Sequence, residues 1–165
     1  YIINKLKRMP DTYTRLYIQL VFAVKGRQSL IHESWEEELY RYITGIVQNS
    51  GHKMLQINGM PDHIHIFFGY NPNQRIPDLV KDIKNYSNNF VKTNGFTKQK
   101  FNWQKGYGAF SYALAQKKNV IRYIENQKEH HRKESFKKEY VYLLQKFEVD
   151  YKEAYLFDFL DKEDD

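Results

Sequence analysis

The order of strand-like and helix-like segments constrains this chain more than any other feature. Alternating β-branched and aromatic residues predict four strands, at 14–24, 52–58, 63–70 and 101–114. Apolar residues at helical spacing predict helices at 34–49 and 76–94, each between two of these strands. The resulting β-α-β-β-α-β order is that of a split βαβ. We therefore expect an α+β, ferredoxin-like fold, with an antiparallel four-stranded sheet and two helices on one face.

Local signals mark where these segments start and stop. Ser34 followed by Glu37 forms a capping box, which predicts that Ser34 caps the first helix. Residues 59–62 form a turn that joins the second and third strands into a hairpin. From Lys117 onward the spacing is helical again, with a break near 131–134, so two further C-terminal helices should follow. One face of the sheet is then left for function.

Charge divides the chain into a basic body and an acidic end. The 165 residues carry a net charge of +6, but 148–165 hold eight acidic residues and two lysines, so the rest carries +12. We expect one domain over 13–147 and an acidic tail over 148–165. A basic body favours a polyanionic partner. The 14 Tyr and 11 Phe could stack on single-stranded nucleic acid, although most aromatic residues fill the core.

What the sequence lacks also narrows the function. Without cysteine, the chain has no disulfide scaffold, thiolate zinc site or cysteine nucleophile. No stretch approaches the roughly 20 apolar residues that span a bilayer. Charges interrupt the first ten residues, where a signal peptide would be apolar. We expect a cytoplasmic protein without membrane contact.

Two histidines, His63 and His65, lie two residues apart in the third predicted strand. Because side chains alternate across a sheet, both imidazoles project from the same face. Two neighbouring imidazoles can bind a divalent metal, but two ligands do not complete a site. The pair could equally be two solvated histidines on the open face of the sheet.

Tyr123 and Gln127 are four residues apart in the helical segment that follows the last strand. At this spacing the phenol and the amide lie on one face of a helix, as a nucleophile and a third metal ligand would. A tyrosine with a pKa of about 10 needs activation at neutral pH, which a metal-bound phosphate and basic residues can supply. The spacing alone is common, and Tyr123 could also be an ordinary helix residue beside Ile124.

Basic residues surround this tyrosine. Residues 116–139 hold eight lysines and arginines against four glutamates, the last of which is Glu139. Such a surface can hold a phosphate backbone. The alternative is a solvated helix whose charges pair along its own surface. His130 and His131 follow on nearly the same face, either as exposed bystanders or as phosphate contacts.

Three stretches, taken together, resemble one known family. PDHIHIFFG at 61–69, WQKGYGAFSYAL at 103–114 and VIRYIENQKEHH at 120–131 follow the order found in single-tyrosine (Y1, HUH) transposases of the IS200/IS605 group. Each motif is weak alone, but the conjunction is specific. The resemblance covers residues 13–147 and leaves out the acidic tail.

The resemblance implies a role for each candidate. His63, His65 and Gln127 would bind Mg²⁺ or Mn²⁺. Tyr123 would attack single-stranded DNA at the ends of an insertion sequence, giving a 5′-phosphotyrosine and a free 3′-hydroxyl, and rejoining would need no ATP. Asp62 could orient His63, although an aspartate in a turn is also common. Members of this family are homodimers, so active sites completed in trans are expected.

The family acts in bacteria and archaea, and the implied partner is single-stranded DNA with hairpin ends. By charge, the candidate DNA contacts are Lys25, Arg27, Lys81, Lys84, Lys92, Lys105, Arg122 and Arg132. Three alternatives stay open: a non-catalytic single-stranded nucleic-acid-binding module, a domesticated relative that processes chromosomal hairpins, and a metal-dependent hydrolase that uses water. The first lacks the outward aromatic residues of RNA-binding sheets, because histidines occupy those positions in the third strand.

Overall fold

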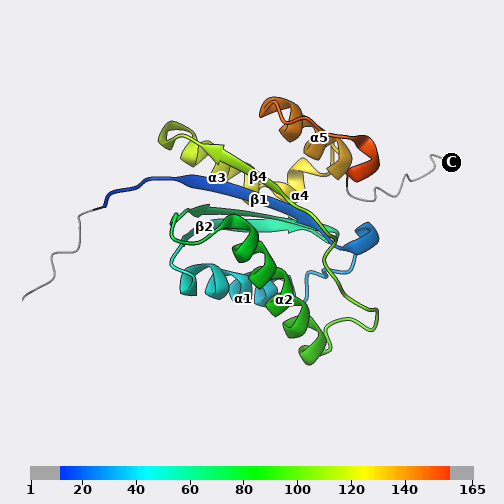
Figure 1. Cartoon of the computed structure of the whole chain (residues 1–165). Helices are drawn as coiled ribbons and strands as arrows, with labels where there is room; N and C mark the ends of the chain where they lie inside the picture. Colours follow the sequence, from blue (N-terminus) through cyan, green and yellow to red (C-terminus); the bar gives the residue numbers. More distant parts are fainter. Residues whose placement is uncertain (1–11, 157–165) are drawn as a thin grey trace, which may run out of the picture.

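A four-stranded antiparallel sheet lies between two layers of helices in the computed structural model, which describes residues 12–156 (Figure 1). The strands are β1 (Tyr17–Ala23), β2 (Lys53–Met60), β3 (His63–Gly69) and β4 (Gly108–Tyr112). Their order across the sheet is β2-β3-β1-β4, and every neighbouring pair is antiparallel. The predicted ferredoxin-like α+β fold is therefore confirmed, with β1 and β3 in the centre.

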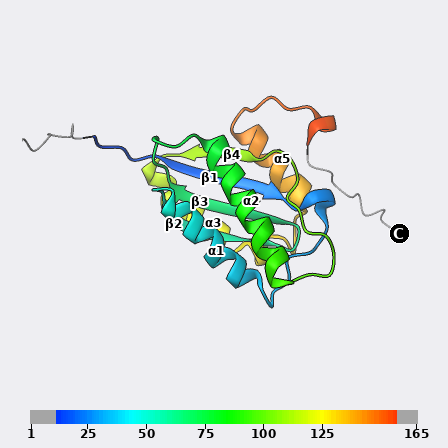
Figure 2. The same cartoon turned by 60° about the horizontal axis from the view of Figure 1, so that its bottom comes forward.

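Helices cover both faces of this sheet. They are α1 (Glu36–Asn49), α2 (Ile76–Asn94), α3 (Lys117–Glu125), α4 (Gln127–His130) and α5 (Phe136–Lys146). Three short 3₁₀ turns are η1 (Lys25–Arg27), η2 (Leu114–Gln116) and η3 (Glu153–Tyr155). Figures 1 and 2 show α1 and α2 on one face, and α3, α4 and α5 on the other. Within residues 12–156, no helix combines the length and apolar character needed to cross a bilayer.

The main core lies between the sheet and the α1–α2 layer. Alternate residues of β1 and β3 point into it. Ile18 is partly buried there, and five of these side chains are fully buried: Leu20, Phe22, Ile64, Ile66 and Phe68. From the helices, Leu39, Ile43, Leu79 and Ile83 complete the contact. Each such side chain contributes about 1.5–3 kcal/mol through burial, so this layer supplies most of the hydrophobic stabilisation.

A smaller apolar cluster attaches the opposite layer. Tyr17 and Phe67 from the sheet pack against Val120 and Ile124 of α3. Two polar contacts fix the same helices to the hairpin: the Asn58 amide donates to the Glu125 carbonyl at 2.9 Å, and the Lys128 ammonium donates to the Gly59 carbonyl at 3.1 Å. The face of the sheet that sequence analysis left for function is therefore covered by α3 to α5.

Two predicted segment boundaries were wrong. Ser34 does not cap α1, which begins at Glu36; its hydroxyl instead lies 2.8 Å from His32 Nδ1. The buried Trp35 ring stacks on Phe96 with centroids 5.2 Å apart, and this packing sets where the helix starts.

The fourth strand is shorter than predicted, at 108–112 instead of 101–114. Trp103 makes one bridge to Val24, donates its indole N–H to the Ser87 hydroxyl at 2.7 Å and packs on the Phe22 ring. Residues 101–107 therefore form a loop that packs against α2, and η2 begins at residue 114.

Only part of the predicted acidic tail lies in the described range. Residues 148–156 continue past α5, and Tyr151 and Leu156 pack, partly buried, against the main core. Residues 157–165 lie outside the described residues. The division of the chain at residue 147 stays a prediction.

The hairpin that carries the histidines depends on a glycine. A Cβ at Gly59 would overlap the His63 carbonyl oxygen and lie 2.9 Å from the Ile64 Cα. We expect Gly59→Ala to lower the free energy of unfolding by about 1–3 kcal/mol through overpacking. Gly45→Ala is the matched control, because that helical Cβ meets nothing within 4 Å; it should raise stability by about 0.5–1 kcal/mol. Urea unfolding measures both, and equal effects of the two variants would contradict the expectation.

Candidate active site

His63 and His65 project from the same face of β3, as the strand alternation predicts. Both side chains are fully buried, and their ring centroids lie 5.3 Å apart. The Phe136 ring of α5 stacks on His63 at 3.9 Å. The alternative of two solvated histidines is therefore wrong, because the C-terminal helices close over them.

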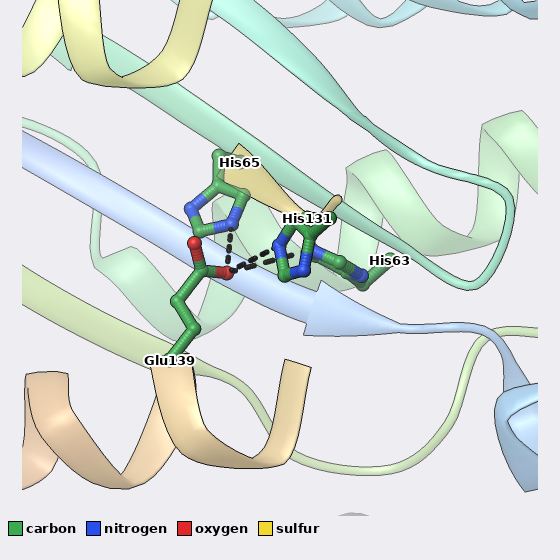
Figure 3. A group of neighbouring side chains, drawn as sticks. All are labelled: His63, His65, His131 and Glu139. Carbon is green, nitrogen blue, oxygen red and sulfur yellow. Dashed lines mark hydrogen bonds and ion pairs between the residues drawn. The ribbon is translucent and has the colours of Figure 1, made fainter. Parts of the chain in front are cut away.

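A carboxylate that sequence analysis did not single out lies between these histidines. The fully buried Glu139 of α5 directs Oε1 toward the Nε2 atoms of His65 at 2.8 Å, His131 at 3.1 Å and His63 at 3.5 Å (Figure 3). We call these four residues the His/Glu cluster. A signal was present in the sequence: Glu139 falls at helical spacing among the buried Phe136, Tyr140 and Leu143. A carboxylate on the apolar stripe of a helix needs a polar partner inside the protein.

Tyr123 and Gln127 meet this same carboxylate. The Tyr123 hydroxyl donates to Glu139 Oε2, and the Gln127 amide donates to the same oxygen at 3.1 Å. The Tyr123 ring centroid lies 6.1 Å from that of His65. The two residues do not share one continuous helix, because Asn126 interrupts it between α3 and α4 (φ −93°, ψ 20°). They still converge on one point within a single chain.

Asp62 fixes the other side of His63. Its Oδ1 lies 2.7 Å from His63 Nδ1, and its Oδ2 pairs with the Arg27 guanidinium at 3.2 Å. Burial by itself would raise the pKa of Asp62, but the bond with His63 and the Arg27 charge outweigh it and hold this pKa below its usual range. The structure therefore contains the orienting contact that sequence analysis considered for Asp62.

Gln19 contacts the Nδ1 atom of His65 as Asp62 contacts that of His63, and sequence analysis did not identify this residue. Its amide lies 2.9 Å from His65 Nδ1 and accepts the Tyr112 hydroxyl at 2.7 Å. Because an amide can present either N–H or C=O, Gln19 can serve both tautomers of the imidazole. The available signal was a glutamine inside an otherwise apolar central strand.

The pKa values of Glu139 and Tyr123 are shifted in opposite directions at this site. Burial would raise the pKa of Glu139, but the charge of His65 and the contacts with His131, His63 and His65 outweigh it, so the pKa lies far below its usual range. Burial, and then the negative charge of Glu139, raise the pKa of Tyr123 well above that of a free phenol. In this arrangement the carboxylate is ionised and the tyrosine is neutral.

The donor set fits a divalent cation. The ligand-type atoms of the His/Glu cluster all lie within 4.8 Å of one another. Two further observations point the same way: His63 Nε2 and Gln127 Oε1 are buried and have no hydrogen-bond partner. Buried polar atoms of this kind normally find partners, so their orphaned state at a cluster of imidazoles and a carboxylate indicates a ligand site.

A groove gives access to Tyr123 from one side. It has a volume of about 840 Å³, and Arg122, Lys133 and Lys138 line it together with Tyr123 and His130. Among the predicted DNA contacts, Arg122 is therefore the one that the structure brings to the tyrosine.

The other predicted DNA contacts lie elsewhere. Lys25 and Lys105 are exposed outside this groove, and Arg132 pairs with Glu129 at 3.3 Å on the surface. Arg27 forms an ion pair with Asp62, which in turn contacts His63 of the cluster. The Lys84 ammonium donates to two carbonyls of the 101–107 loop at 2.7 and 2.6 Å, and burial lowers its pKa to about 8.

Gln19 offers a direct test of the support around His65. We expect Gln19→Leu to lower the free energy of unfolding by about 2 kcal/mol, because it leaves a buried nitrogen of His65 and the part-buried hydroxyl of Tyr112 without partners. Gln99→Leu, at an exposed position, is the control and should stay within about 0.5 kcal/mol of the parent. Chemical unfolding followed by circular dichroism measures both; a Gln19→Leu protein as stable as the control would contradict this account.

Sequence comparisons identify relatives of this chain. The sequence model of a family described as "Transposase IS200 like" matches residues 12–127. The ISDra2 transposase TnpA of Deinococcus radiodurans is 26% identical over 118 residues, which cover 68% of this chain and 84% of that protein.

Two solved structures share the fold. A putative transposase from Deinococcus radiodurans superposes with a TM-score of 0.59 at 24% identity, covering 74% of this chain and 98% of the other. A REP-associated tyrosine transposase bound to a REP hairpin gives a TM-score of 0.52 at 14% identity, with 73% and 72% covered. Since the family match spans more than half of the sequence, the chain belongs to the IS200-like transposases.

Proposed function

We propose that this transposase cuts and rejoins single-stranded DNA with Tyr123 as the nucleophile. One observation carries the proposal: the Tyr123 hydroxyl reaches the buried carboxylate that the two β3 histidines also contact. The same hydroxyl belongs to a residue that lines a groove with three basic side chains and two glutamates. A nucleophile, a cation-type donor set and an approach for a phosphate thus occur at one place.

The chemical step exchanges one phosphate ester for another. The Tyr123 oxygen forms a bond to phosphorus while the bond from phosphorus to the 3′ oxygen breaks. The phenol loses one proton and the released 3′-hydroxyl gains one, so the step is balanced. A 5′-phosphotyrosine conserves the ester, and rejoining is the reverse reaction without ATP.

His63, His65 and Gln127 are the residues that we propose hold Mg²⁺ or Mn²⁺. When bound, such a cation polarises the phosphate and offsets its negative charge. Asp62 and Gln19 keep the two imidazoles in their orientation. Arg122, Lys133 and Lys138 would bind the phosphates on either side of the scissile bond, because they line the groove beside the tyrosine.

The proposed partner is single-stranded DNA with hairpin ends. The REP-associated relative is described as bound to a hairpin, and the basic body of this chain suits such a ligand. Lys25, Lys105 and Arg132 are exposed and stay proposed contacts away from the reacting phosphate. Arg27 and Lys84 make internal contacts, so we propose that they act by shaping the site and the loop. We propose that the protein acts on DNA in a bacterial or archaeal cytoplasm.

The contacts of the helices that carry Tyr123 and Gln127 bear on whether one chain or two complete the active site. The sequence resemblance predicts homodimers with sites completed in trans. The contacts of α3 and α4 with their own hairpin favour a site within one chain instead, because Asn58 and Lys128 bind these helices beside His63 and His65. We propose a site completed in cis.

The covalent step gives the first prediction for this function. Tyr123→Phe should reduce the covalent adduct with single-stranded DNA from the flanks of the gene, in Mg²⁺ or Mn²⁺, by at least ~1,000-fold. Denaturing gel electrophoresis separates the adduct from free protein. Tyr86→Phe is the matched control, since Tyr86 is 53% exposed on α2, and its adduct should match that of the parent chain.

The same gel distinguishes the alternatives. An undiminished adduct in Tyr123→Phe would overturn the tyrosine mechanism. DNA cleavage without any adduct would favour the hydrolase that uses water. Tight binding with neither adduct nor cleavage would favour a binding module.

Mixing two inactive variants tests the subunit arrangement. A His65→Ala chain keeps its tyrosine, and a Tyr123→Phe chain keeps its histidines. If each site is completed in cis, the co-refolded mixture should form no adduct beyond the background of either variant alone. Recovery of roughly a quarter of the parent activity would establish sites shared between two chains, since half of the randomly formed dimers would be mixed and each would hold one intact site.

A further inference from the structure

We infer that the cation site of this chain is completed by residues that follow α4, with Glu139 of α5 as a carboxylate ligand and His131, next to the end of α4, as a third imidazole ligand. The inference deepens the proposed function and rests on it, because that function assigns the cation to His63, His65 and Gln127. Both added residues lie beyond residue 127, where the family match ends. The region outside the shared transposase sequence would thus contribute to the reaction centre.

The distances from the Glu139 carboxylate to the three imidazoles are compatible with a coordination shell. Around a divalent ion with metal–ligand bonds of about 2.1 Å, neighbouring ligand atoms lie ~3.0 Å apart in an octahedron and ~3.4 Å apart in a tetrahedron. Glu139 Oε1 lies 2.8, 3.1 and 3.5 Å from the Nε2 atoms of His65, His131 and His63. The three nitrogens thus gather around the carboxylate oxygen, and all four ligand-type atoms lie within 4.8 Å of one another.

Orphaned atoms argue against a purely hydrogen-bonded network. A cluster that existed only to bury Glu139 would use its donors and acceptors fully. Here His63 Nε2 has no hydrogen-bond partner although its side chain is buried, and Gln127 Oε1 is also buried and unpaired. The Gln127 amide nitrogen bonds Glu139, so its oxygen is held at the cluster without a donor. A cation would satisfy both atoms.

The charge of the ligands supports the same conclusion. Two imidazoles and an amide are neutral, whereas hard divalent cations in proteins are usually bound through at least one carboxylate. Glu139 is the carboxylate that lies, fully buried, among these histidines. Three imidazoles add nitrogen ligands that Mn²⁺ accepts better than Mg²⁺ does. We therefore expect Mn²⁺ to bind this chain more tightly than Mg²⁺.

Mn²⁺ binding to the full chain, measured by electron paramagnetic resonance without DNA, tests this inference. Glu139→Gln keeps the shape of the side chain but removes its charge, and should weaken Mn²⁺ binding at least ~10-fold. His131→Asn should weaken it by a similar factor and reduce the number of imidazole nitrogens seen by electron spin echo modulation from three to two. Glu129→Gln is the control, because Glu129 is 62% exposed; its affinity should stay within twofold of the parent.

Two results would overturn the inference. One is a Glu139→Gln protein that folds and binds Mn²⁺ within twofold of the parent chain, and the other is a parent chain that binds no Mn²⁺. Circular dichroism establishes folding, and Glu139→Asp replaces Glu139→Gln if the latter does not fold; the shortened carboxylate should also weaken binding.

The inference and the proposed function can fail separately. Glu139-dependent Mn²⁺ binding in a chain that never forms a tyrosine–DNA adduct would uphold the site and overturn the nucleophile. A Tyr123-dependent adduct in a chain whose Mn²⁺ affinity ignores Glu139 and His131 would uphold the function and overturn the added ligands.

Discussion

The two-sided burial of β3 is the constraint on which the rest of this structure depends. Ile64, Ile66 and Phe68 point to the α1–α2 layer, and His63 and His65 point the other way. A strand in the centre of a sheet cannot shift by one residue without exchanging these two sets. The main core therefore fixes the register of the two histidines and holds the proposed metal-binding pair in a packed interior.

Buried imidazoles need a counterpart, and α5 supplies it. Removing either Glu139 or its imidazole partners would cost several kcal/mol of stability. The charge that remained would be buried without a partner and without water. Glu139 also accepts the Tyr123 hydroxyl and the Gln127 amide. The group that stabilises the covered face thus also holds the proposed nucleophile near the proposed ligands. Stability and reactivity are linked here through one carboxylate.

Much of the fold followed from local patterns. The order of elements, the hairpin and the paired histidines are readable because strand alternation and helix periodicity are properties of neighbouring residues. The capping box at Ser34 failed because the packing of Trp35 on Phe96 set the start of α1. The predicted fourth strand was too long because Trp103, which fits a strand pattern, lies in a loop and bonds Ser87 of α2 instead.

The candidate site was only half readable. Tyr123 and Gln127 attracted attention through their spacing and family motif, while Glu139 looked like one more charge in a basic segment. Its position in space depends on how the chain turns between α4 and α5, since 74 residues separate it from His65. No local pattern encodes a contact at that separation.

By itself, the sequence determined the sheet, the face shared by His63 and His65, and the family to which the chain belongs. Those features depend on periodicity and on motifs that neighbouring residues carry. Only the tertiary structure decided that the opposite face is covered and that Glu139 and His131 enter the site. The physical reason is that a helix settles where its apolar stripe finds a matching surface, and this choice brings distant polar groups together.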